Sequence, residues 1–107
     1  PVADASQDVV TCIYLFHELP PKIRRVVASE IARVLKPGGR LIFTDALQKG
    51  DKASLDMLLD FFPWAFHEPY FASYTKEDFT GLFDETGLGR LSETPAFLSK
   101  VMVFEKR

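Results

Sequence analysis

The stretch "RVLKPGGRLIFTD", residues 33–45, decides the fold, because it joins a helical apolar rhythm to an unbroken apolar strand across a Lys-Pro-Gly-Gly turn. Upstream of the turn, apolar residues recur at helical spacing and predict a helix from Lys22 to Leu35. The proline of the turn forbids continuation of the helix, and we expect Gly38 or Gly39 to end it in a left-handed cap. The strand that follows is predicted over Leu41 to Thr44.

The predicted helix has an apolar side and a charged side, and Pro20 and Pro21 suit its first turn. Its apolar stripe consists of Ile23, Val26, Val27, Ile31, Val34 and Leu35. The basic residues on or near the opposite side, which we expect to be solvated, are Arg24, Arg25, Arg33 and Lys36.

A second apolar run, "DVVTCIYLF" from Asp8 to Phe16, precedes the helix and is rich in β-branched and aromatic residues. It shows no period-two alternation, which is typical of a strand buried on both faces of a parallel sheet. Strand, helix and strand together make a βαβ unit with a right-handed crossover. The fold class is therefore α/β, with a doubly wound arrangement.

The C-terminal part predicts one helix and a hairpin. Thr75 opens the helix, with Asp78 three residues later as a variant of the capping box, and Gly87 caps its end. The buried stripe of this helix is expected to be Phe79, Leu82 and Phe83. Two strand-like runs, Arg90 to Thr94 and Val101 to Glu105, predict a closing antiparallel pair.

Composition and charge exclude several function classes. The chain has 107 residues, 47% hydrophobic and 26% charged, as in a single globular domain. A formal net charge of −2 gives no electrostatic case for a nucleic-acid partner or an anionic membrane surface. Every apolar run stops well short of the roughly 18 residues of a membrane span. Cys12 is the single cysteine, so no internal disulfide forms and a cytoplasmic location is expected.

Three pieces of sequence carry a family resemblance: "DASQDVV", "FHELP" and "EIARVLKPGGRLIFTD", followed by a helix and a hairpin. Over nearly its whole length the chain resembles the C-terminal half of class I S-adenosylmethionine-dependent methyltransferases. The most specific piece is "RVLKPGGRL", set one helix downstream of the "DVV" strand. The resemblance implies a partial Rossmann-like sheet, equivalent to the family's strands 4-5-7-6, with a terminal antiparallel hairpin.

The family's glycine-rich loop after its first strand has no counterpart, nor has the acidic residue after its second strand. Gly38-Gly39 does not substitute, because it follows a helix and precedes a strand. We therefore expect residues 1–107 to be the C-terminal half of a methyltransferase domain without its N-terminal cofactor-binding half. The resemblance implies a fragment that uses S-adenosylmethionine to methylate a small molecule and is inactive alone. The alternative is a non-catalytic Rossmann-like module for dimerisation or partner binding.

Ligands of open α/β sheets bind beyond the carboxyl ends of the strands. The resemblance points to the same place: Cys12, Ile13 and Tyr14 would contact the cofactor, and Phe16 and Glu18 would lie near the substrate. Packing as a small buried hydrophobe is the alternative for the Cys12 side chain.

His17 is the candidate catalytic residue, since imidazole titrates near neutrality and can take a proton from an attacking hydroxyl or amine. A loop hydrogen bond is its alternative role. Glu18 is its neighbour in sequence, but adjacent side chains usually point apart, so this pair is not expected to work together. Asp45, at the end of the second strand, either meets the substrate or caps the following turn.

The aromatic stretch "MLLDFFPWAFHEPYF" could cover an apolar or planar substrate, with Trp64, His67 and Tyr70 lining it. The alternatives are plain core packing and a patch that pairs with another chain. No residues have the spacing of metal ligands, so no metal site is expected.

The Asp8 to Phe16 strand would be central in a complete domain. Without its neighbour it leaves a long hydrophobic edge with no guarding lysine or proline, which is a template for pairing. We therefore expect the chain to form a homo-oligomer, or to bind the N-terminal half through residues 8–16.

Overall fold

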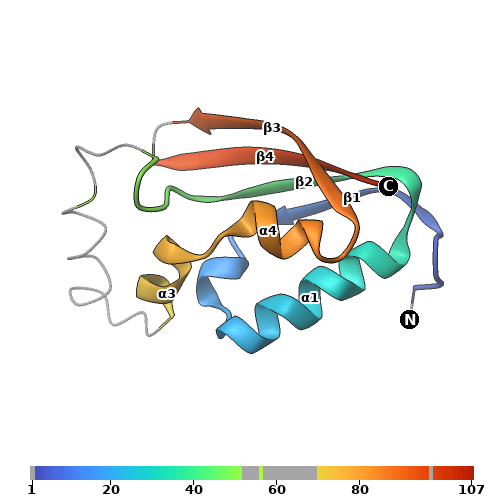
Figure 1. Ribbon diagram of the computed structural model, residues 1–107, viewed down its shortest axis with the longest axis horizontal. Helices are drawn as coiled ribbons and strands as arrows, with labels where there is room; N and C mark the ends of the chain where they lie inside the picture. Colours follow the sequence, from blue (N-terminus) through green and yellow to red (C-terminus); the bar gives the residue numbers. More distant parts are fainter. Residues whose placement is uncertain (1, 52–55, 57–69, 97) are drawn as a thin grey trace.

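A computed structural model of the chain describes residues 2–51, 56, 70–96 and 98–107. In chain order its elements are β1 (Gln7–Ile13), the 3-10 turn η1 (Phe16–Glu18), α1 (Pro21–Val34), β2 (Leu35–Ala46), α3 (Phe71–Lys76), α4 (Phe79–Asp84), β3 (Leu88–Ala96) and β4 (Ser99–Lys106). The strands form one sheet of order β1-β2-β4-β3 (Figure 1). β1 and β2 are parallel, and β4 is antiparallel to β2 and β3. The expected 4-5-7-6 arrangement with a closing antiparallel hairpin is confirmed.

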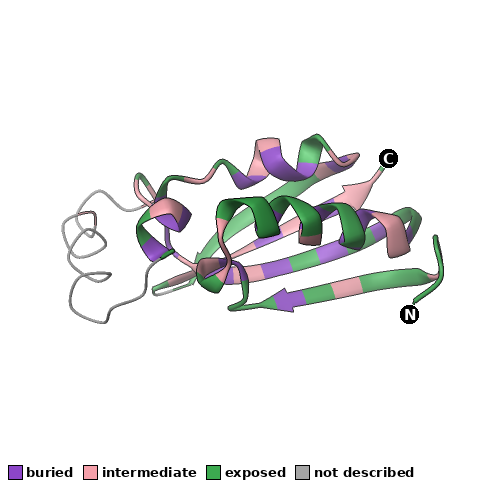
Figure 2. Cartoon of the chain, turned by 90° about the horizontal axis from the view of Figure 1, so that it is seen from below, coloured by how far each residue is buried: buried purple, intermediate pink, exposed green. Residues whose placement is uncertain are grey.

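The helices α1, α3 and α4 lie on one face of this sheet (Figure 1). Buried residues alternate with less buried ones along β2 and β4 (Figure 2), and Cys12 of β1 and Phe43 of β2 lie in the core. On the opposite face Val9, Ile13 and Ile42 remain 52%, 63% and 37% exposed. The prediction of a first strand buried on both faces is therefore wrong for this chain, because no element in the described ranges covers the second face.

The first strand is shorter than the predicted Asp8 to Phe16. β1 ends at Ile13, and Tyr14 takes a left-handed backbone conformation with φ of 53°. A positive φ turns the chain out of the extended conformation, so the residues that follow enter η1 instead. Within the described part of the chain, β1 pairs only with β2 and is an edge of the sheet.

The predicted glycine cap of the first helix is also wrong. α1 ends at Val34, and Leu35 is already extended and paired with Gln7 of β1. Gly38, with φ of 81°, belongs to an irregularity at the start of β2 across which the pairing moves from Leu35 to Arg40. The glycines therefore shape the entry into the strand, because glycine adopts positive φ without steric cost.

The buried side of α1 differs from the apolar stripe. Ile23 is exposed, Val26 is 62% exposed, and Arg24 is completely buried, which contradicts its expected solvation. The residues of the helix that are buried in the core are mostly small: Ala28, Ile31 and Ala32. Arg24 is tolerated inside because its hydrogen-bonding groups find partners there, as described below.

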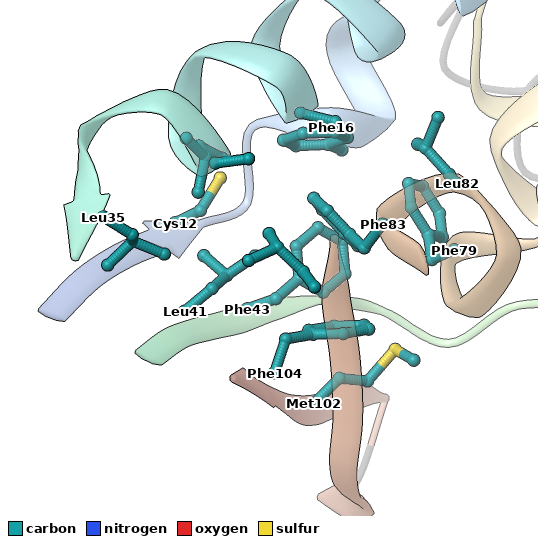
Figure 3. Packing of buried hydrophobic residues seen from close by; sticks show 14 of the residues in the cluster. Cys12, Phe16, Leu35, Leu41, Phe43, Phe79, Leu82, Phe83, Met102 and Phe104 are labelled. Atoms are coloured by element: carbon teal, nitrogen blue, oxygen red, sulfur yellow. The ribbon is translucent and has the colours of Figure 1, made fainter. Parts of the chain in front are cut away.

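The core is a cluster of aromatic rings between the sheet and the helices (Figure 3). The ring of Phe16 packs edge-on against Phe43, with centroids 5.3 Å apart, and Phe83 lies 4.7 Å from Phe104. Such tilted and edge-to-face contacts stabilise aromatic clusters beyond area burial alone.

The C-terminal helix begins at Phe79 rather than at Thr75, which lies in α3. Asp78 is its N-cap and accepts a hydrogen bond from the Gly81 amide at 3.0 Å, because the first amides of a helix lack partners. The C-cap is Glu85 and not the predicted Gly87, which lies two residues further on with φ of 92° and donates its amide to the carbonyl of Asp84. The predicted buried residues Phe79, Leu82 and Phe83 are confirmed.

Candidate functional site

His17 and Asp45 meet at the carboxyl ends of the two parallel strands. β1 and β2 run side by side up to the pairing of Ile13 with Thr44, so the residues beyond both ends lie together. His17 lies in η1, just after β1, and Asp45 is the penultimate residue of β2. Nδ1 of His17 is 2.8 Å from Oδ1 of Asp45. This is the edge at which open α/β sheets bind their ligands.

The carboxylate of Asp45 is completely buried and accepts from more than the imidazole. The amide of Ala46 donates to it at 2.8 Å, and the amide of His17 lies 3.4 Å away. An ionised carboxylate only accepts hydrogen bonds, so the proton of the imidazole sits on Nδ1. Nε2 of His17 then carries the lone pair and is able to accept a proton.

The imidazole of His17 packs against aromatic neighbours and is partly exposed to solvent. Its ring is edge-on to Phe71 and Tyr74, with centroids 6.0 and 6.1 Å away. The side chain is 14% exposed, and Nε2 lies 3.8 Å from Oε1 of the exposed Glu18, beyond hydrogen-bond distance. Nδ1 therefore faces the buried carboxylate of Asp45, whereas Nε2 lies beside the exposed side chain of Glu18.

Asp45 accepts from the amide of Ala46, which is still in β2, and from His17, which it orients. It does not form the predicted cap of the following turn, where the amide of Gln48 donates to Asp51 instead. The expectation that the side chains of His17 and Glu18 point apart is wrong, since Nε2 of His17 and Oε1 of Glu18 lie 3.8 Å apart. We did not predict that His17 and Asp45 would pair. The available signal was their common position at the carboxyl ends of two adjacent parallel strands.

The three predicted cofactor residues lie at the end of β1 in different environments. Cys12 is a buried core residue, so its side chain follows the alternative of a small hydrophobe (Figure 3). Burial raises the pKa of its thiol to about 11, and the charge of Asp45 adds to the effect. Ile13 and Tyr14 are exposed, and the Tyr14 hydroxyl is hydrogen-bonded to Ser99. Cofactor contacts of all three residues stay a prediction.

The predicted substrate-lining residues are also scattered. Phe16 is completely buried among the core rings and has a packing role, because no part of its surface is open to a ligand. Glu18 and Tyr70 are exposed. Trp64 and His67 lie outside the described residues, and their role stays a prediction.

A second polar cluster surrounds the buried ammonium of Lys100, next to the same edge. Its Nζ lies 2.7 Å from Oε1 of Gln48, 3.0 Å from Oδ2 of Asp51 and 3.2 Å from Oε1 of Glu93. The three acceptors satisfy the ammonium, so the cluster ties β4 to β3 and to the segment after β2. Across the ranges that the structure describes, no three His, Cys, Asp or Glu side chains are grouped as metal ligands.

Comparison with known proteins supports the resemblance. Residues 1–43 match the family model described as a methyltransferase domain. No curated protein matches the chain by sequence. Of the helices in the described segments, none is long and apolar enough to cross a membrane.

Solved structures share the fold. The mitomycin 7-O-methyltransferase MmcR superposes with a TM-score of 0.73 at 19% identity, over 100% of this chain and 31% of that one. An O-methyltransferase family 2 protein from Planctomyces limnophilus, in complex with apigenin, gives 0.72 at 16% identity, over 95% and 31%. A putative methyltransferase from Haloferax volcanii, in complex with the activator Trm112, gives 0.64 at 18% identity, over 98% and 56%. The chain thus spans from under a third to about half of these proteins, and it shares its fold with that part of them.

Proposed function

We propose that this chain, which shares its fold with part of known methyltransferases, is the C-terminal half of a class I methyltransferase domain. In this proposal it is part of an enzyme that methylates a small molecule, with His17 as general base. The observation that carries the proposal is the 2.8 Å hydrogen bond between His17 and Asp45 at the carboxyl edge of the sheet. The match of residues 1–43 to the methyltransferase domain model supports the reaction class. The small-molecule O-methyltransferases among the solved structures support the substrate class.

S-Adenosylmethionine, when bound, supplies a methyl group that is already activated on a sulfonium. The protein must then hold the acceptor atom in line and exclude water. Nε2 of His17 would take the proton that the acceptor oxygen or nitrogen loses on methylation. Asp45 keeps the proton of the neutral imidazole on Nδ1 and stabilises the imidazolium that forms.

The residues of this chain fit the cofactor only as one wall of a site. Ile13 and Tyr14 are exposed at the end of an edge strand, where a ligand can lie against them. The remaining walls come from an N-terminal half of the domain, so we propose that the 107-residue chain alone is inactive.

The uncovered face of the sheet supports association as part of the function. Val9, Ile13 and Ile42 are exposed apolar side chains on this face, and among the described strands β1 pairs on one side only, with β2. We propose that the N-terminal half covers both, and that self-association replaces it when the chain is alone.

The same surface favours the second candidate function, a non-catalytic module for dimerisation or partner binding. A cytoplasmic location is part of the proposal.

The test compares the 107-residue chain alone with the chain reconstituted with the segment that the same reading frame encodes upstream. Calorimetry with S-adenosylhomocysteine is expected to show binding only after reconstitution. In the reconstituted enzyme, His17→Ala is expected to lower kcat by about 10²- to 10⁴-fold with cofactor binding retained. Glu85→Gln, which removes an exposed carboxylate just after α4, is the control and leaves kcat unchanged.

Two outcomes would contradict the proposal in different ways. Full activity of His17→Ala would exclude His17 as the base. Failure of the reconstituted protein to bind S-adenosylhomocysteine would favour the non-catalytic module.

A further inference from the structure

Arg24 is the most deeply buried charged residue on α1, and its side chain reaches two other elements. Its Nε donates to the carbonyl of Phe16 at 3.2 Å, directly before His17. Its Nη2 donates to the carbonyl of Tyr70 at 2.9 Å and to Oγ of Ser73 at 3.0 Å, in and beside α3. The guanidinium therefore joins the backbone of η1 to the start of α3.

A carboxylate compensates the buried charge. Nη1 of Arg24 lies 3.7 Å from Oε1 of Glu77, which follows α3. Burial lowers the pKa of the guanidinium, and Glu77 offsets part of the change. An arginine starts so far above neutrality that it stays charged, and its planar fork can serve several acceptors at fixed angles.

Tyr74 provides the corresponding link to the second strand. Its hydroxyl donates to the carbonyl of Ala46, directly after Asp45. Its ring lies edge-on to the imidazole of His17, and the guanidinium of Arg24 sits over it at 5.9 Å from the centroid. Burial raises the pKa of the phenol, and the charge of Asp45 adds to this, so the hydroxyl stays a donor.

We infer that Arg24 and Tyr74 are positioning residues that hold His17 and Asp45 in hydrogen-bonding register, an inference that rests on the proposed role of His17. Arg24 fixes the peptide before the histidine, and Tyr74 fixes the carbonyl of Ala46, in the second peptide after the aspartate. The contact of the guanidinium with the phenol ring joins the two restraints through α3, which packs beside η1.

This arrangement has a consequence for the imidazole tautomer. Free histidine favours the proton on Nε2, whereas the bond to Asp45 requires it on Nδ1. A displacement of either peptide lengthens the 2.8 Å bond and releases that requirement. The protonated nitrogen of His17 therefore reports the positioning directly, and the measurement needs no enzymatic activity.

The experiment records long-range ¹H–¹⁵N spectra of the histidine side chains at a pH where the imidazole is neutral. The chain has two histidines, so the His67→Gln background assigns the His17 signals. The reference protein is expected to show the Nδ1–H tautomer. Tyr74→Phe, which keeps the ring, and Arg24→Met, which keeps the alkyl stem, are expected to move the Nδ1 and Nε2 resonances toward the Nε2–H pattern.

The matched control is Arg25→Met, one position further along the same helix, where the side chain is 54% exposed. It is expected to leave the tautomer unchanged. In the reconstituted enzyme, Tyr74→Phe and Arg24→Met should lower kcat by about 10- to 100-fold without raising KM for the methyl donor. In the His17→Ala background neither variant should lower kcat further, because residues that act through His17 are not additive with it.

An unchanged Nδ1–H tautomer in a folded Tyr74→Phe variant would overturn the inference, whatever the kinetics show. If Arg24→Met does not fold, Tyr74→Phe carries the test alone. Full activity of His17→Ala would defeat the proposed function but not the positioning, because the tautomer shift is measured independently.

Discussion

The ammonium of Lys106, near the end of the last strand, donates to the backbone carbonyls of Ala32 and Leu35 at 2.6 and 2.7 Å. These carbonyls belong to the end of α1, where the helix has no further amides to bond them. A cation at this position also interacts favourably with the negative end of the helix dipole. The final strand of the chain therefore caps its first helix.

Lys106→Met is expected to lower the free energy of unfolding by about 1–3 kcal/mol, because two partly buried carbonyls lose a charged donor. Urea denaturation measures the change. Lys22→Met, at an exposed position of the same helix, is the control and should stay within about 0.5 kcal/mol of the parent. Equal losses in both variants would refute the capping role.

Gly39→Ala is expected to destabilise the fold by about 1–3 kcal/mol through steric overlap. A Cβ at this position would lie 2.8 Å from the carbonyl oxygen of Lys36 and 3.1 Å from that of Asp8, and backbone atoms cannot move aside cheaply. Gly89→Ala is the control, since its new Cβ would meet the flexible end of the Arg107 side chain at 3.1 Å. Thermal melting should show a larger loss for Gly39; the reverse order would contradict the close approach.

Cys12 should make the protein less stable in alkali. Burial raises the pKa of its thiol from 9.0 to about 11, so between these values the unfolded chain loses a proton that the folded chain keeps. Stability from this group is complete below pH 9 and is lost as pH rises toward 11, by on the order of 2–3 kcal/mol.

Chemical denaturation of the parent and of Cys12→Ala across this range isolates the thiol. The alanine variant starts less stable, because it leaves a small cavity, but it should lose less stability between pH 9 and 11. Parallel curves for the two proteins would show that the thiol does not titrate as expected.

The uncovered sheet face should drive self-association of the isolated chain at micromolar concentration. Ile42→Lys places a charge in the middle of this face and is expected to raise the dissociation constant at least about tenfold, equivalent to about 1.4 kcal/mol. Val26→Lys, on the outward side of α1, adds the same charge elsewhere and serves as control. Sedimentation equilibrium gives both values, and a monomeric parent chain would contradict the prediction.

The sequence was sufficient for the βαβ unit and the closing hairpin. The apolar run after Asp8, the helical spacing after Pro21 and the run after Gly39 each record a local preference that the sheet preserves. The buried residues of α4 could also be predicted from the sequence, because a short helix that packs on a core buries one side at helical spacing. These features follow from local periodicity and turn chemistry.

Sequence reasoning failed where a contact overrides local preference. The position of Arg24 on the charged side of the helix predicts a solvated side chain. Its actual partners, the carbonyls of Phe16 and Tyr70, cannot be recognised from the neighbouring sequence. The glycines after α1 had the pattern of a helix cap, but the pairing of Leu35 with Gln7 begins the strand earlier.

The sequence by itself determined which elements form, their order along the chain and the class of sheet they build. Only the tertiary structure decided that Asp45 is hydrogen-bonded to His17. It also decided that Arg24 and Tyr74 donate to the carbonyls of the neighbouring residues, Phe16 and Ala46. The physical reason is the distance along the sequence over which each interaction acts. Backbone preference and apolar period act over a few residues, whereas a hydrogen bond between side chains 28 positions apart exists only after two strands have been brought into register.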